Sequence, residues 1–313
     1  MGADDNRHMN NLPPIDGATP LTHWGLIRAQ GADAASFLHG QLTHDFSQLG
    51  LSQARLAGYC SAKGRLLASF VAWKVADDEL LLACHASVLA ATLKRLSMFV
   101  LRAKCRLSDA SSDLLLLGVA GPAADALAGD APVWGKTEVN GAGVVRLPPA
   151  AGQSRILWAG SGAAPAPPEL DLDAWRWLEV QSGVPVIEAP TVEQFVPQML
   201  NFELIGGVNF QKGCYPGQEV VARSQYRGTT KRRMFLFDIE APAAAGQEVF
   251  HSADTGQPAG MVVNAAPRPG QTGSSALVEI KLAALELGSL HLGTADGPRL
   301  TRVALPYEVT SAD

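Results

Sequence analysis

Charge is scarce in this sequence. Asp, Glu, Lys and Arg together make up 18% of the 313 residues, against about 25% in an average soluble protein. The 25 basic residues do not outnumber the 30 acidic ones, and the formal net charge is −5. This balance excludes a generally basic protein that coats nucleic acid. Hydrophobic residues reach 47%, so the chain can bury large cores and does not have the composition of a disordered protein.

Signals for membrane insertion, secretion and metal binding are also missing. No apolar run reaches the roughly 18 residues of a membrane span, and the opening MGADDNRHMNNLPP has acids where a signal peptide has an apolar segment. The seven histidines show no metal-binding spacing. No C-x-x-C pair occurs, so neither a zinc site nor a disulfide framework is indicated. We expect a cytoplasmic protein, away from membranes, whose four cysteines are reduced: Cys60, Cys84, Cys105 and Cys214.

The order of predicted elements indicates an α+β fold in four parts. After an N-terminal arm at 1–22, strands and helices alternate in a first α+β domain at 23–110 and again in a second at 111–233. Short strands separated by Gly/Pro turns then fill 234–313, which is typical of a small β-barrel.

Three local patterns give more detailed predictions. Ala62–Arg65 separates two apolar runs and predicts a hairpin turn. Residues 100–107 read as a strand. Leu170–Ser182 predicts a helix, because Asp171 and Asp173 lie in its first turn and Gly183 follows its end.

The most unusual stretch surrounds Cys214. Pro216 suits the first position of a helix, which would place the thiol just before a helix N-terminus, where the partial positive charge favours thiolate. Lys212 would add to that effect, while Gly213 and Gly217 allow backbone conformations closed to other residues. Two interpretations stay open at this point: a reactive or ligand-contacting thiol, or a buried structural cysteine in a Gly/Pro loop.

Charged residues follow the thiol at helical spacing. Glu219, Arg223 and Arg227 are four residues apart and share one predicted helix face. Residues 223–233 contain five basic residues and no acid. This basic cluster could attract a polyglutamate tail or an RNA phosphate. The alternative is a solubilising surface at a domain junction. The cluster consists of Arg223, Arg227, Lys231, Arg232 and Arg233.

The eight residues Lys212-Gly-Cys-Tyr-Pro-Gly-Gln-Glu219 resemble the signature of the YgfZ family, folate-binding proteins related to the aminomethyltransferase (T-protein) of the glycine cleavage system. Three further segments resemble sequences of the same family: Phe37–Asp45, Cys60–Gly64 and Phe195–Gln198. The resemblance implies two ferredoxin-like α+β domains and a C-terminal β-barrel around a central channel that holds tetrahydrofolate or a one-carbon-substituted reduced folate. It also implies support of iron–sulfur enzymes, including those that methylthiolate tRNA.

The resemblance assigns roles to individual residues. Cys214, assisted by Lys212, would carry the chemistry, and Gly213, Gly217 and Glu219 would shape the turn. Glu179 lies in a segment similar to the T-protein's pterin-binding Glu, and a carboxylate can accept two adjacent pterin N–H groups. The alternative is that Glu179 faces solvent. The remaining folate-binding residues would be Tyr215, Gln218, Arg223 and Arg227. We expect Cys214 and Glu179 to face one shared cavity.

Whether the chain is an enzyme stays open at the sequence level. T-proteins have a catalytic Asp where this chain has Ala68 and Ser69, and neither side chain carries charge. We therefore expect a folate-holding protein whose partners are iron–sulfur enzymes or their assembly proteins. The alternatives are a one-carbon transferase with a relocated acid such as Asp45, and a scaffold with a vestigial folate site. Direct contact with tRNA and the oligomeric state stay open.

Overall fold

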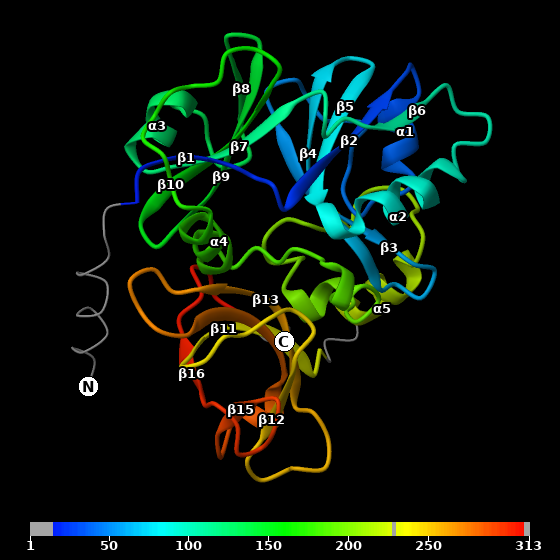
Figure 1. The fold of residues 1–313 in the computed structure, drawn as a ribbon. Coiled ribbons are helices and arrows are strands. Elements are labelled where there is room, and N and C mark those ends of the chain that lie inside the picture. Colours follow the sequence, from blue (N-terminus) through cyan, green and yellow to red (C-terminus); the bar gives the residue numbers. More distant parts are fainter. Residues whose placement is uncertain (1–14, 227–229, 310–313) are drawn as a thin grey trace.

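A computed structural model describes residues 15–226 and 230–309. These residues form three antiparallel sheets with five α-helices placed around them (Figure 1). No helix in the described ranges is long and apolar enough to cross a membrane. The predicted α+β class is therefore confirmed.

The first sheet has the strand order β3-β4-β5-β2-β6. The β3–β4 hairpin forms where the turn at 62–65 predicts it. Of the strand expected at 100–107, only its end is extended, because β6 begins at Arg106. The strands are β2 (Trp24–Gln30), β3 (Ala54–Cys60), β4 (Leu66–Ala76), β5 (Glu79–His85) and β6 (Arg106–Asp109).

The second sheet has the order β1-β7-β10-β9-β8. Its edge strand β1 corrects the prediction of an arm over 1–22, because residues 17–20 pair with β7. Ile15 and Leu21 on either side of β1 are buried, which a free arm would not allow. Residues 1–14 lie outside the described ranges. The strands are β1 (Gly17–Pro20), β7 (Leu115–Ala120), β8 (Lys136–Val139), β9 (Ala142–Ala150) and β10 (Gln153–Gly160).

The third sheet is a half-barrel, in the region where the sequence predicts a small β-barrel. Its order β15-β12-β13-β14-β11-β16 has two end strands, and its concave side holds a core of its own that includes Phe235 and Phe237. The strands are β11 (Arg232–Ile239), β12 (Glu248–His251), β13 (Gly260–Pro267), β14 (Ser274–Lys281), β15 (Leu290–Leu292) and β16 (Leu300–Val303).

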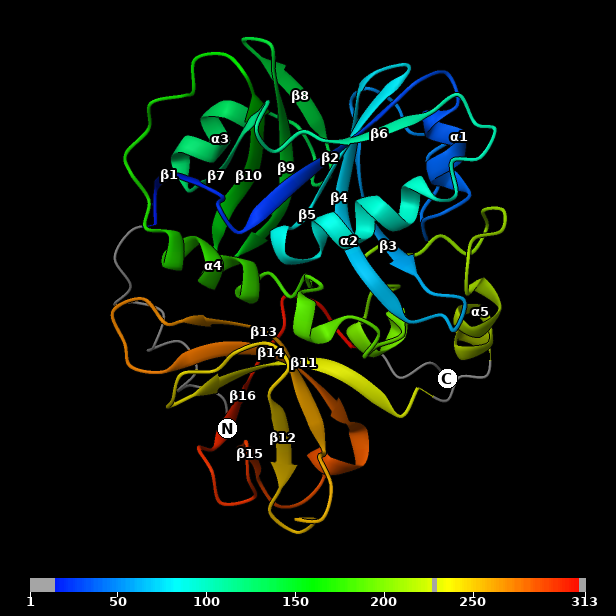
Figure 2. The same cartoon turned by 45° about the vertical axis from the view of Figure 1, so that its right-hand side comes forward.

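The first two sheets pack face to face, and helices cover their outer faces (Figures 1 and 2). Trp73 of β4 and Leu157 of β10 belong to the shared inner core. This two-sided burial explains why β4 reads as an almost continuous apolar run. Helices α1 (Ala34–His39) and α2 (Ala86–Ser97) cover the first sheet, and α3 (Pro122–Ala128) covers the second.

Helix α4 (Leu172–Gln181) connects the three sheets. It matches the helix predicted at 170–182, and the Asp171 side chain caps it by accepting the backbone N–H of Asp173 at 2.7 Å. Trp175 and Trp177 of α4 are buried in the core that the first two sheets share. The indole of Trp177 also donates to Ser275 of β14 in the half-barrel. Figure 2 shows α4 between the paired sheets and the half-barrel.

Candidate functional site

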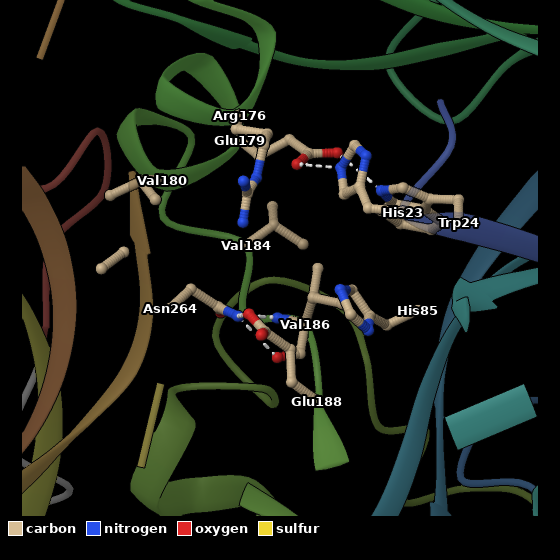
Figure 3. Close-up of a pocket in the computed structure, with 11 residues that line it drawn as sticks. His23, Trp24, His85, Arg176, Glu179, Val180, Val184, Val186, Glu188 and Asn264 are labelled. Atoms are coloured by element: carbon tan, nitrogen blue, oxygen red, sulfur yellow. Dashed lines mark hydrogen bonds and ion pairs between the residues drawn. The ribbon is translucent and has the colours of Figure 1, made fainter. Parts of the chain in front are cut away.

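A pocket lies where α4, the first sheet and the half-barrel meet (Figure 3). The space within it that the centre of a water molecule can occupy is about 30 Å³, which is enough for a water molecule or two. With its open mouth the empty space is about 380 Å³. The lining residues come from distant parts of the chain: His23, Trp24, His85, Arg176, Glu179, Val180, Val184, Val186, Glu188, Asn264 and Ala265.

Glu179 points into this junction rather than into bulk water, and 16% of its side chain is exposed. The indole N–H groups of Trp24 and Trp175 both donate to its Oε1 at 2.8 Å. His23 Nε2 lies 2.9 Å from its Oε2. Trp175 is one helical turn before Glu179, so α4 itself supplies one of the three donors. The alternative that Glu179 faces solvent is therefore wrong, and the partners of its carboxylate are side chains of this chain.

Two histidines stand beside this carboxylate. His23 and His85 meet edge to face, with ring centroids 6.1 Å apart. Burial lowers the pKa of His85, and the nearby carboxylate of Glu188 opposes that shift. His23 Nδ1 is buried without a hydrogen-bond partner among the described residues. A buried polar atom without a partner is costly, and at a pocket wall it is a natural contact for a ligand.

The signature segment around Cys214 lies elsewhere, against the first sheet. Lys212 is 8% exposed, and its ammonium donates to the carbonyls of His39 and, at 2.9 Å, Leu42. The His39 carbonyl is at the C-terminal end of α1, where a cation is favourable, and Leu42 lies three residues beyond the helix. The same ammonium lies 4.8 Å from the centre of the Tyr215 ring. Burial lowers the pKa of Lys212 to about 8, although the charges of Asp45 and Cys214 oppose the shift.

Two of the other segments that resemble the family, Phe37–Asp45 and Cys60–Gly64, therefore meet the signature segment in space. Gly217 has φ +80° and packs so closely on the β3–β4 turn that an added Cβ would lie 2.4 Å from the Ser61 carbonyl oxygen. At Gly213 an added Cβ would lie 3.5 Å from Nε2 of His39, an ordinary contact. The His39 Nδ1 atom in turn lies 2.9 Å from Asp45.

Cys214 itself is exposed. Helix α5 (Gln218–Tyr226) begins four residues beyond the thiol, so the prediction that Cys214 directly precedes a helix N-terminus was wrong. Tyr215, Pro216 and Gly217 form a turn between them. The expectation of one cavity shared with Glu179 was also wrong, because none of the residues 212–219 lines the pocket. The thiol and the buried carboxylate form two separate clusters.

The other residues of the predicted folate set also lie away from the pocket. Tyr215 is buried, and burial raises its pKa, beyond the range of any physiological titration. Gln218 and Glu219 open α5. Arg223 lines a second hollow together with Lys231 and Arg232. Arg227 lies outside the described residues.

The basic cluster is largely neutralised by acids that are distant in sequence. Arg232 pairs with Glu279 through two nitrogens, one at 2.8 Å. Arg233 pairs with Glu203, and both side chains are buried. Arg223 and Lys231 are the members without such an acid among the described ion pairs. The cluster is thus a smaller anion-attracting surface than its sequence suggests.

The position of the T-protein's catalytic Asp is occupied by structure-forming side chains. Ala68 and Ser69 are buried in β4, and the Ser69 hydroxyl accepts the backbone N–H of Ile187 at 3.0 Å. Asp45, the alternative acid, interacts with His39 and Ser47 beside the signature segment. Burial opposes its ionisation, but hydrogen bonds from Ser47, Gln48 and His39 outweigh it and lower the pKa of Asp45 to about 2.

Several pocket residues had no signal in the sequence. They come from four separate places in the sequence: His23 and Trp24, His85, Glu188, and Asn264. They meet only because the first sheet and the half-barrel converge at α4, and no local motif marks that convergence.

Comparison with known proteins identifies the family. Residues 17–132 match the family model of the GCVT N-terminal domain. A tRNA-modifying protein YgfZ from Edwardsiella ictaluri is 34% identical over 245 residues, 69% of each chain. Another from Cronobacter sakazakii is 30% identical over 247 residues, covering 71% of this chain and 73% of that one. The chain belongs to the YgfZ family.

The fold relates the YgfZ family to the T-proteins. The crystal structure of the glycine cleavage system aminomethyltransferase T from Bartonella henselae superposes with a TM-score of 0.73. The match covers 96% of this chain and 88% of that one at 18% sequence identity. At this identity the likeness establishes the common fold and leaves the activity to the site residues.

Proposed function

We propose that this YgfZ-family protein binds a reduced folate in the pocket at Glu179 and, through Cys214, supports iron–sulfur enzymes that act in tRNA modification. The observation that supports folate binding is the position of Glu179. Its carboxylate is held in place by three side-chain donors at a pocket wall, in a fold shared with a folate-dependent transferase family. The names of the curated relatives as tRNA-modifying proteins support the second half.

The chemistry of the pocket suits the pterin of a folate. A pterin offers adjacent N–H donors on its pyrimidine edge, and the pocket offers the carboxylates of Glu179 and Glu188. It also accepts hydrogen bonds through its ring nitrogens and 4-oxo group. Arg176 is the matching donor of the chain. The unpartnered Nδ1 of His23 can accept a further N–H from the ligand, because the other ring nitrogen faces Glu179.

Entry of a pterin ring requires the lining side chains to move, because the volume that water centres can occupy in the pocket is only about 30 Å³. Arg176 can move without breaking a strong contact. Its side chain is 39% exposed, and its ion pair with Asp173 is long, at 3.8 Å. Exposed pairs of this kind contribute little to stability.

Aminomethyl transfer has less support than folate holding. An acid at the T-protein position would carry the charge that such a reaction needs, whereas the Ser69 hydroxyl here is engaged by the Ile187 amide. Asp45 interacts with side chains at the signature segment and not with those of the pocket. We therefore favour a binding protein whose exposed thiol acts on or with a client enzyme.

A cell assay with one cysteine variant tests the proposal. In a bacterial strain that lacks its own YgfZ, Cys214→Ser should fail to restore methylthiolated tRNA, while the purified variant keeps its affinity for tetrahydrofolate. Cys105→Ser is the matched control, because Cys105 lies outside both clusters, and it should restore the modification fully. Full restoration by Cys214→Ser would reduce the thiol to a structural residue.

A further inference from the structure

Glu179 has little hydrogen-bonding capacity left for a ligand. A carboxylate accepts about four hydrogen bonds, two at each oxygen. Oε1 already accepts from Trp24 and Trp175, and Oε2 interacts with His23. About one position at Oε2 is free, so Glu179 alone cannot accept two adjacent N–H groups through separate oxygens.

A second carboxylate, Glu188, lines the same pocket. Its side chain accepts from Asn264 Nδ2, which lies 2.8 Å from Oε1, and from the Thr191 backbone N–H in a capping box, so about two of its four acceptor positions are free. Figure 3 shows Glu188 and Asn264 together at the wall of the pocket, across from Glu179 and His23. Glu188 is therefore the acid of this pocket with more acceptor capacity to offer.

The backbone of Glu188 is fixed by its neighbours. It precedes a 3₁₀ turn, Ala189–Thr191. The hydroxyl of Thr191 accepts the Glu188 N–H at 3.0 Å, and the Thr191 N–H donates to the Glu188 carbonyl at 2.9 Å. A fixed backbone lowers the entropy lost when the side chain orders around a ligand.

Asn264 is fixed still more firmly. Its Oδ1 accepts the Val186 N–H at 2.9 Å, and its Nδ2 donates to the Val186 carbonyl at 2.8 Å as well as to Glu188. The residue follows a register shift in the pairing of β13 with β14. Such bulges re-aim side chains and are frequent beside active sites. Here the bulge lets the half-barrel orient a carboxylate that stands on the segment after α4.

We propose that Glu188, oriented by Asn264, accepts the 2-amino N–H edge of the bound pterin and so selects ligands that carry this edge. Glu179 supplies one further bond at most and mainly holds Trp24, Trp175 and His23 in place. The inference rests on the proposed folate function. It goes beyond it by naming the residue pair that recognises the donor edge.

Calorimetric titration with 5-formyltetrahydrofolate tests this assignment. Glu188→Gln replaces one acceptor oxygen by an amide that repels N–H donors, so its affinity should fall at least tenfold. Asn264→Ala should weaken binding less, because it frees Glu188 without removing it. The charge-matched control is Glu240→Gln, at an exposed position outside the pocket, and it should bind like the wild type.

A change in the ligand tests the same contact without any variant. The wild type should bind a 2-desamino analogue of the same folate at least tenfold more weakly, and Glu188→Gln should no longer discriminate between the two ligands. Equal affinity of the wild type for both ligands would overturn the assignment, and so would unchanged affinity in a folded Glu188→Gln protein. A wild type that binds neither ligand would instead refute the proposed function.

Discussion

At the scale of single residues, Glu179 has a role in the fold besides the role in ligand binding that we propose. It was predicted as a pterin contact from its resemblance to the T-protein segment. The structure adds that it is the hydrogen-bond acceptor of a completely buried indole, that of Trp175. Neither Trp24 nor His23 could be linked to it from the sequence, because about 155 positions separate them.

This double role predicts the effect of Glu179→Ala on stability. The variant leaves the Trp175 N–H buried without an acceptor, which costs about 1–3 kcal/mol, and affects Trp24 and His23 as well. Glu179→Gln keeps one acceptor oxygen and should lose less. Urea denaturation of both variants measures the difference, and equal stability of Glu179→Ala and the wild type would contradict the hydrogen-bond network.

His44 predicts how stability depends on pH. Burial, with the nearby charge of Arg55, lowers its pKa from 6.5 to about 4, although the hydrogen bond from Asp45 and the Asp45 charge oppose the shift. Between pH 4 and pH 6.5, the His44 imidazole therefore binds a proton more strongly in the unfolded chain than in the folded chain. Stability from this residue is therefore complete above pH 6.5 and is lost as the pH falls through about 4.

The measurement is a series of urea denaturations between pH 7 and pH 4. His44→Asn cannot titrate, and its amide oxygen can still accept the Asp45 N–H, so its stability should fall less over this interval than that of the wild type. His85 shifts in the same direction, but it is present in both proteins and cancels in the comparison. Parallel pH profiles would show that His44 titrates normally in the fold.

At the scale of elements, the signature segment is a turn fitted onto the β3–β4 hairpin. The sequence predicted that Gly213 and Gly217 matter for backbone conformation, and the structure separates the two. Gly217 has a positive φ and no room for a Cβ, while Gly213 has neither constraint. The sequence could not distinguish them, because the difference depends on Ser61 and Gly64, which are about 150 positions away.

The two glycines form a matched pair of variants. Gly217→Ala would place its Cβ 2.4 Å from the Ser61 carbonyl oxygen and 2.6 Å from the Gly64 Cα, both backbone atoms, and would strain the left-handed backbone. It should lose about 1–3 kcal/mol of stability. Gly213→Ala should stay within about 0.5 kcal/mol of the wild type. Thermal unfolding of both variants measures the contrast, and equal effects would mean that the turn is not packed as described.

Helix α5 shows where local rules failed. Pro216 suits the first helical position in principle, but the chain uses it inside the turn that docks on the hairpin, and the helix begins only at Gln218. Tertiary contacts of Lys212 and Gly217 decided the boundary. The predicted dipole effect on Cys214 is correspondingly weaker, since it falls off within one turn of the helix end.

At the scale of the whole molecule, the class and order of the units were predictable, since hydrophobic periodicity changes along the chain. The way in which the units meet around α4 was not predictable from the sequence. The segment taken as an arm contributes β1 to the second sheet, although it is followed directly by β2 of the first. The chain thus ties both sheets together within its first 30 residues, and His23 lies at the crossing point.

This corrected role of the N-terminal segment predicts a core mutation. Ile15 is 6% exposed and belongs to the core between the two sheets, so Ile15→Ala should lose about 2–4 kcal/mol of stability. Leu101→Ala is the control, because Leu101 is 89% exposed and its truncation should change stability by less than about 0.5 kcal/mol. Equal unfolding midpoints for the Ile15 variant and the wild type would show that the segment is an unattached arm.

The central claim is that the pocket between α4, the first sheet and the half-barrel binds a reduced folate, independently of the exposed thiol. Calorimetric titration of tetrahydrofolate into the Cys214→Ser protein tests it directly. The account predicts a saturable heat with the same affinity as in the wild type, because no residue of the signature segment lines the pocket. Absence of heat at about 1 mM ligand, where even weak specific binding is detected, would contradict it.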